Sequence, residues 1–372
     1  MKILSLGLDN SVLDKNSSLV QRVIEFGNLV EKYNVIVPVG QSQEIELSGR
    51  VKIFGVAGAG KIFKLFRIYK LAKGLIERER YDVITVQDAY FLALAGQRLA
   101  KKFGLGLEIQ IHGWEKFCGW RKIIARYLLP RASAVRVVSQ RLKRELINKF
   151  GVEEKKITMV PIYSEVRSQK SEVRSRLGDE FVFLTVGRLV PVKNINLQIE
   201  AMADIVKIYP ATRLWIVGDG PEKENLKFKI VSLRETTRRV ENLKLGNNIK
   251  LLGWQNDLTK YYSQADAFLL TSNYEGWGLT VIEAASFGLA IVMTDVGCAG
   301  EVIKNGESGF VVPVGDKVAL KQAMIKLIED GELRKKMGEA ARQAVLKLPG
   351  KEQTLFLYLA SWQKAARHTF KL

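Results

Sequence analysis

A glycine-containing turn in the second half of the chain is framed by two glutamates, Glu275 and Glu283. The segment reads SNYEGWGLTVIE over residues 272–283 and is expected to lead from a strand into a helix. Such a turn presents backbone N–H groups and the positive end of the helix dipole, and both favour a phosphate. Because a phosphate would repel a nearby carboxylate, the glutamates are better suited to hydroxyl groups, Glu283 to a ribose and Glu275 to a sugar. An acidic helix cap with one solvated glutamate is the structural alternative.

Two cations lie five residues apart in a second turn, GRLVPVKN over residues 187–194. This turn follows a predicted strand, which puts it at the carboxyl edge of a parallel sheet, where ligands bind in such folds. Arg188 can bind phosphate oxygens as a two-pronged fork and Lys193 as a point charge. Together they are suited to neutralising a diphosphate leaving group. Two solvated loop cations are the alternative.

Weaker signals follow three other predicted strands. Gly218 and Gly220 belong to a Gly-Asp-Gly turn, where the absence of side chains lets backbone approach a ligand closely. The glycines before Glu301 have the same property, and both segments are also ordinary turns. His112 is one of two histidines in the chain and follows a predicted strand, which leaves a ligand-facing and a structural role both open.

These turns need parallel sheets to hold them in place. Short β-branched apolar runs recur along the chain, each followed by a helix-like stretch. Near-continuous apolar strands that alternate with helices are typical of parallel sheets covered on both faces. We therefore predict an α/β protein with two doubly wound domains. The predicted strands are 2–8, 34–39, 51–56, 82–86, 107–111 and 134–138, then 181–186, 213–217, 249–252, 267–270, 290–293 and 309–312.

A polar stretch without clear periodicity, residues 161–179, separates the two series of strands. It predicts an N-terminal domain over residues 1–165 and a C-terminal domain over residues 166–354. The charged stretch 222–248 is expected to be helical.

The composition is that of a globular protein and excludes a disordered tail or a coiled coil, since 47% of the 372 residues are hydrophobic and 26% charged. The 58 Lys and Arg outnumber the 39 Asp and Glu, and the net charge of +19 predicts a phosphate-rich partner. Two cysteines cannot form a disulfide framework, so a reducing cytoplasm is expected. No run approaches the ~18 apolar residues of a transmembrane helix, so membrane contact would be peripheral.

Four segments, taken in order, resemble the nucleotide-sugar half of the retaining glycosyltransferases of family 4, the glycosyl transferases group 1. They read GRLVPVK, GDGP, EGWGLTVIE and DVGCAGE, and they lie within residues 181–314. The first half is similar through His112-Gly113 and residues 132–139. The resemblance implies a GT-B fold, in which two Rossmann-like domains face each other across a cleft and a C-terminal helix, about residues 355–372, returns to the first domain.

The resemblance also implies a role for each matching residue. Arg188 and Lys193 would hold the donor diphosphate, Glu283 the ribose and Glu275 the sugar hydroxyls, while His112 would lie beside the transferred sugar. The implied catalytic residues are therefore His112, Arg188, Lys193 and Glu275. The implied donor-binding residues are Gly187, Gly218, Gly220, Gly276, Trp277, Gly278, Leu279, Thr280 and Glu283. Two departures stand out: GLDNS at residues 7–11 replaces a common Gly-Gly loop, and Asn194 replaces a common glycine.

The implied reaction transfers a hexose from a nucleotide sugar with retention of the anomeric configuration. The leaving phosphate accepts the acceptor's proton, and the protein supplies positioning and charge stabilisation. The family usually needs no metal, which agrees with the absence of an Asp-x-Asp motif. We expect no metal and no cofactor besides the donor substrate.

Residues 60–73 carry a cation at every third position, with Phe63 and Phe66 among the cations and apolar residues on the other side of a helix at ~100° per residue. Aromatic residues among cations are typical of an interfacial membrane helix, and a solvated basic face is the alternative. Residues 119–131 add Trp120 and further cations. We predict peripheral binding to the inner face of the cell membrane and an acceptor that is lipid-linked or a growing surface polysaccharide. The predicted membrane-surface residues are Lys61, Lys64, Arg67, Lys70 and Lys73.

Two other classes of function stay open. A nucleotide-sugar epimerase of similar fold would need acid–base groups on both sides of the sugar, and His112 is the only obvious candidate in the first half. An inactive homologue could use its positive charge to bind a membrane or a nucleic acid. No zinc-finger spacing or RNP-like aromatic pattern supports nucleic-acid binding, so we expect no nucleic-acid partner.

Overall fold

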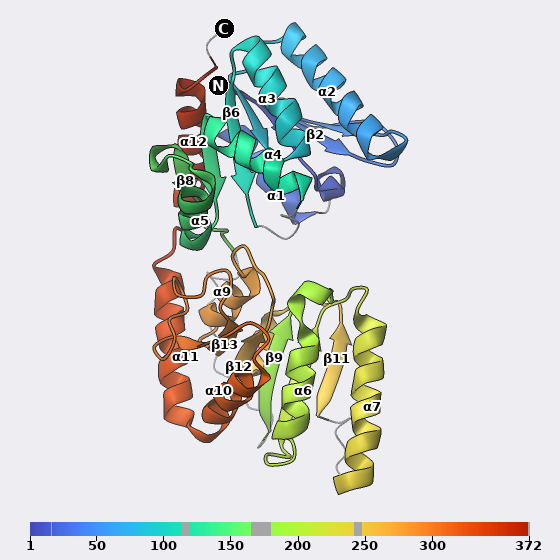
Figure 1. The fold of residues 1–372 in the computed structure, drawn as a ribbon, viewed down its shortest axis with the longest axis vertical. Helices are drawn as coiled ribbons and strands as arrows, with labels where there is room; N and C mark the ends of the chain where they lie inside the picture. The colour runs from blue at the N-terminus through green and yellow to red at the C-terminus, as the bar shows by residue number, and fades with distance from the viewer. Residues whose placement is uncertain (16, 114–118, 165–179, 242–247, 371–372) are drawn as a thin grey trace. The chain divides into compact units, whose positions relative to one another are not determined.

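Two sheets of mainly parallel strands, each in a unit of its own, make up the fold. The computed structural model describes residues 1–15, 17–113, 119–164, 180–241 and 248–370 (Figure 1). One unit comprises Met1–Ile162 and Pro349–Leu372, and the other Tyr163–Leu348. Most of the polar stretch predicted to separate the domains, residues 165–179, lies outside the described residues, as does Cys118.

The first unit is built on an eight-stranded sheet in the order β3-β4-β2-β1-β5-β6-β7-β8. Every pairing is parallel except that of β3 with β4 at one edge. The strands are β1 Lys2–Leu6, β2 Lys32–Pro38, β3 Gln43–Ser48, β4 Val51–Val56, β5 Val83–Val86, β6 Gly106–Ile111, β7 Ala134–Val137 and β8 Ile157–Met159. The helices are α1 Ser18–Asn28, α2 Gly60–Arg78, α3 Phe91–Phe103, α4 Trp120–Leu128, α5 Gln140–Phe150 and α12 Lys351–Arg367.

The second unit has a six-stranded sheet in the order β11-β10-β9-β12-β13-β14, and all its pairings are parallel. The strands are β9 Phe181–Val186, β10 Thr212–Val217, β11 Ile249–Gly253, β12 Ala267–Leu270, β13 Ala290–Thr294 and β14 Gly309–Val312. The helices are α6 Ile195–Ile205, α7 Lys223–Glu241, α8 Thr259–Gln264, α9 Leu279–Ser286, α10 Lys317–Glu329 and α11 Gly331–Leu346. The α/β class is therefore confirmed, with two doubly wound sheets.

Burial on both faces of the sheet explains why the central strands could be predicted from the sequence. In β12 and β13 every residue is buried, and all of these residues except Thr294 are apolar. Local signals bound the helices: the Ser139 side chain accepts a hydrogen bond from the Leu142 amide at the start of α5, and Gly151 ends that helix in the left-handed conformation.

Two strands were missing from the prediction, and both are at sheet edges. The sequence of β3 is QEIELS, and its Glu46 pairs with Lys52 of β4 at 2.9 Å, so this strand is solvated and polar. Strand β8 is only three residues long. The predicted helix 222–248 is correct over α7, Lys223–Glu241, and residues 242–247 are not described.

A buried carboxylate fastens the C-terminal helix α12 to the sheet of the first unit. Glu108 of β6 is fully buried and lies 3.2 Å from the Arg136 Nε of β7. From α12, Ser361 Oγ and Trp362 Nε1 both donate hydrogen bonds to the same carboxylate. The Arg136 guanidinium also stacks 3.9 Å from the ring centre of Tyr358. Each charge is thus paired, which a buried charge requires.

We expect Glu108→Gln to destabilise the first unit by roughly 3–5 kcal/mol, because it leaves Arg136 buried without its counter-charge. Chemical denaturation followed by circular dichroism measures this. Glu145→Gln breaks an ion pair of 3.0 Å on the surface of α5 and serves as the control, with almost no expected change. Equal effects of the two substitutions would contradict the role of the buried pair.

Candidate active site

The two strongest sequence segments meet at the carboxyl edge of the second sheet. Strands β9 and β12 are neighbours where the strand order reverses, and a ligand crevice forms at such a point. The turn after β9 and the turn after β12 are joined by the Asn273 amide, which donates to the Val192 carbonyl at 2.7 Å. Thr271 Oγ1 adds bonds to the carbonyls of Lys193 and Asn194, at 3.2 and 3.0 Å.

An ion pair links the predicted catalytic residues Lys193 and Glu275 across these turns. Lys193 Nζ contacts Glu275 Oε1, and Ser272 Oγ donates to the same oxygen at 2.7 Å. The side chains are 21% and 12% exposed, so the pair is partly shielded from water and still reachable by a ligand. Sequence reasoning identified both residues and missed that they neutralise each other.

Arg188 is the other cation of the site, and its environment is different. Its side chain is exposed, and it forms no ion pair within the described part of the chain. It is therefore accessible to an anion, whereas Lys193 is already paired with Glu275.

Asn194 explains one departure from the resembled pattern. Its φ of +46° puts it in the left-handed region, and among the described residues it is the one non-glycine with a positive φ. Asparagine tolerates this conformation better than other side-chain-bearing residues, which is why it can replace a glycine here. Its Nδ2 also donates to Asn273 Oδ1 at 3.2 Å, so the substitution adds a further link between the two turns.

Gly218 and Gly220 pack closely against the backbone of the turn that carries Arg188. A Cβ on Gly218 would lie 1.9 Å from the Gly187 carbonyl oxygen, and one on Gly220 would lie 2.4 Å from that of Leu189. The Leu189 amide in turn donates to the Asp219 carbonyl at 2.9 Å. The structure thus gives these glycines a packing role, and their predicted contact with a donor stays a prediction.

Helix α9 begins next to the ion pair and has an open N-terminus. Gly278 precedes it with a φ of +94°, and no side chain caps it. The first amides of a helix lack intrahelical partners, so those at Leu279 and Thr280 suit an anion. The Trp277 side chain is buried, which leaves only its backbone and that of Gly276 to face a ligand. The segment after β13 holds Trp277 in place, since the Cys298 amide donates to its carbonyl at 2.8 Å.

Glu283 lies one turn into α9 and is only 8% exposed. Its Oε1 accepts a hydrogen bond from Ser164 Oγ at 3.1 Å and its Oε2 one from Tyr262 Oη at 2.9 Å. Burial raises the pKa of the Glu283 carboxyl, against the opposing effect of these hydrogen bonds. Sequence reasoning missed Ser164 and Tyr262, because neither belongs to a motif and only the fold brings them to Glu283.

His112 belongs to the first unit, at the carboxyl edge of its sheet. It follows β6, its side chain is exposed, and its Nε2 lies 3.3 Å from Gln110 Oε1. Gln110 Nε2 donates to Thr85 Oγ1 at 2.6 Å, and Thr85 donates to the buried Glu108. The ring is therefore held by a chain of hydrogen bonds that reaches the core of the unit.

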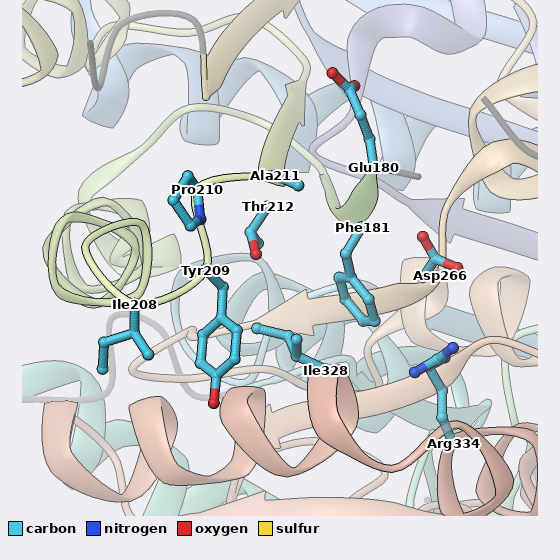
Figure 2. Close-up of a pocket in the computed structure, with 10 residues that line it drawn as sticks. All are labelled: Glu180, Phe181, Ile208, Tyr209, Pro210, Ala211, Thr212, Asp266, Ile328 and Arg334. Atoms are coloured by element: carbon cyan, nitrogen blue, oxygen red, sulfur yellow. The ribbon is translucent and has the colours of Figure 1, made fainter. Parts of the chain in front are cut away.

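A hollow of about 430 Å³ lies at the opposite end of the second sheet, where its strands begin (Figure 2). Phe181, Thr212 and Asp266, at or next to the starts of β9, β10 and β12, line it. It contains none of the predicted site residues and is at the amino edge, away from the position where ligands bind in this type of sheet. Within the described residues, no group of three His, Cys, Asp or Glu could hold a metal ion.

Known proteins match both units. Residues 166–344 match the family model of Glycosyl transferases group 1, and residues 35–162 match that of Glycosyltransferase Family 4. An uncharacterized glycosyltransferase of Methanocaldococcus jannaschii is 25% identical over 288 residues, 75% of this chain and 74% of that protein. The UDP-Gal:alpha-D-GlcNAc-diphosphoundecaprenol alpha-1,3-galactosyltransferase of Escherichia coli is 24% identical over 288 residues, 72% of this chain and 70% of that protein.

The solved structure of Anabaena Alr3699/HepE in complex with UDP superimposes with a TM-score of 0.75 at 18% identity, over 98% of this chain and all of that one. At this identity it establishes the fold, and the GT-B architecture expected from the four segments is confirmed. The chain belongs to the GT-B glycosyltransferases, with a first unit of Glycosyltransferase Family 4 and a second unit of Glycosyl transferases group 1.

Proposed function

We propose that the protein is a retaining, metal-independent hexosyltransferase that uses a UDP-sugar donor and a lipid-linked or polysaccharide acceptor. The observation that carries the proposal is the convergence of Arg188, Lys193 and the uncapped start of α9 at one edge of the second sheet. Three cationic or partly positive groups at one crevice suit a diphosphate. A UDP donor is favoured because the E. coli relative is named for UDP-Gal and Alr3699/HepE was solved with UDP.

When the donor binds, its diphosphate replaces Glu275 as the partner of Lys193. A diphosphate carries more negative charge than one carboxylate, so it competes with Glu275 for Lys193. Glu275 is then released to accept hydrogen bonds from the sugar hydroxyls, while Ser272 continues to donate to it. Glu283 needs no such exchange, because each of its oxygens accepts one hydrogen bond and retains a lone pair for the ribose.

In the proposed transfer the bond from the anomeric carbon to the leaving phosphate breaks, and the bond to the acceptor oxygen forms on the same face of the sugar. The leaving phosphate takes the acceptor's proton. Arg188, Lys193 and the α9 amides stabilise the charge that develops on that phosphate, and His112 orients the sugar. No metal ion or cofactor takes part.

Helix α2 supports peripheral contact with the inner face of the cell membrane. Lys61, Arg67 and Lys70 are exposed on it, whereas Lys64 and Lys73 are half-buried. No helix among the described residues is long and apolar enough to cross a bilayer. The E. coli relative is named for a diphosphoundecaprenol-linked acceptor, which favours a lipid-linked acceptor here.

The donor site is tested by thermal stabilisation with UDP, GDP and ADP. UDP at 100 times its Kd should stabilise the wild type by roughly 2.7 kcal/mol. Arg188→Ala and Lys193→Ala should each lose most of this stabilisation. Lys227→Ala, which removes an exposed cation of α7 that pairs with Glu224 at 2.7 Å, should keep it. Equal losses in all three variants would show a nonspecific charge effect and contradict the site.

The variant Glu275→Gln distinguishes the contribution of Glu275 to sugar transfer from its effect on diphosphate binding. Because glutamine does not hold Lys193 as an ion pair, the variant should bind UDP more tightly than the wild type. Transfer of the sugar should fall by tenfold or more, on the order of the effect of losing one positioned hydrogen-bonding group. Isothermal titration with UDP and a transfer assay measure the two effects. A loss of UDP affinity like that of Lys193→Ala would contradict the exchange.

The raised pKa of Glu283 predicts a pH dependence that is specific to the ribose. As the pH falls through that pKa the carboxylate becomes neutral, and UDP should lose affinity relative to pyrophosphate, which has no ribose. The ratio of the two Kd values is the measurement, because the phosphates of both ligands titrate. In Glu283→Gln the ratio should not depend on pH. A constant ratio in the wild type would contradict the assignment of Glu283 to the ribose.

A further inference from the structure

Large apolar side chains are exposed on three neighbouring helices of the first unit. Figure 1 shows α2, α3 and α4 side by side on one face of the sheet. Ile62 is 86% exposed, Phe66 61% and Trp120 78%. Phe63, Phe91, Ile123 and Tyr127 are exposed on the same helices. Single exposed apolar residues are common, but a cluster of this density marks an interaction surface.

An apolar groove of about 440 Å³ runs between α2 and α3. Its lining comes from one stripe on each helix, with the spacing of a single helical face, residues 62, 65, 66 and 69 on α2 and residues 91, 94, 95 and 98 on α3. Arg98 is the one charged residue of this lining. A groove lined by two apolar stripes suits a hydrocarbon chain.

The charge on the three helices is almost entirely positive. They carry twelve Lys and Arg and a single acidic residue, Glu77, which pairs with Lys73 at 3.4 Å. A uniformly cationic surface with exposed aromatic residues is typical of a site that binds an anionic lipid surface.

One end of the groove, lined by Ile62 and Phe91, lies at the carboxyl ends of the strands, where ligands bind in such sheets. Helices α2, α3 and α4 follow β4, β5 and β6, so their N-terminal ends lie at the carboxyl edge of the first sheet. Ile62, Phe91 and Trp120 are all in the first turns of their helices. His112 follows β6 at that same edge.

We propose that the groove between α2 and α3 holds the hydrocarbon tail of a phosphate-bearing acceptor lipid. The cations of the three helices contact its phosphate and the surrounding headgroups, and the aromatic residues of α4 lie in the membrane interface. This proposal rests on the proposed function and adds a tail-binding site to it. It places specificity for the acceptor in the lipid as well as in the sugar.

Vesicle sedimentation tests the occupant of the groove. Phosphatidylcholine vesicles that contain a small fraction of polyprenyl phosphate should bind the protein more tightly than phosphatidylcholine–phosphatidylglycerol vesicles of equal charge. Phe66→Asp and Phe91→Asp should each weaken binding to the polyprenyl vesicles by roughly tenfold, the effect of losing one buried aromatic contact. Phe356→Asp, at a 68%-exposed phenylalanine of α12 outside the groove, is the matched control and should bind as the wild type does.

Equal binding to both kinds of anionic vesicle, unchanged by the substitutions at Phe66 and Phe91, would overturn the proposal and leave an electrostatic surface without a tail site. Absence of binding to either would overturn it as well. Chemical denaturation followed by circular dichroism checks that the first unit of each variant is folded, and Phe66→Ala with Phe91→Ala replace any variant that fails this check. Because vesicle binding needs no catalysis, its failure is distinguishable from failure of the donor site.

Discussion

The site depends on one ion pair, Lys193 with Glu275, between two turns that are 82 residues apart in the sequence. The reversal of strand order brings β9 next to β12, and their turns then meet at the carboxyl edge. In this pair the carboxylate of Glu275 neutralises the charge of Lys193. A site built in this way is preorganised without leaving Lys193 uncompensated, and under the proposed function a bound diphosphate would release Glu275.

The remaining features hold this arrangement in place. Gly218 and Gly220 let the turn after β10 pack directly against the turn that carries Arg188. The Cys298 amide holds the backbone of Trp277 through a hydrogen bond to its carbonyl. Ser164 and Tyr262 orient Glu283 through one hydrogen bond each. Such positioning is the main contribution a protein can make when the leaving phosphate itself accepts the proton.

Sequence alone predicted the parts of the molecule that local patterns determine. Strand β9 was predicted at its observed bounds because each of its residues is buried or partly buried and apolar or small. Edge strand β3 was missed because its exposed glutamates resemble a loop, and α8 carried no sign that Tyr262 would reach Glu283. The charges at Arg188, Lys193 and Glu275 were identifiable from their spacing. The pairing of Lys193 with Glu275 was not, because it depends on which strands are neighbours.

A double-mutant cycle on UDP binding tests the exchange most directly. The Kd for UDP would be measured for the wild type, Lys193→Ala, Glu275→Gln and the double variant. If Glu275 acts on UDP only by holding Lys193, Glu275→Gln should alter affinity in the wild type and have no effect once Lys193 is absent. Additive effects of the two substitutions would show that the residues act independently and would contradict the account.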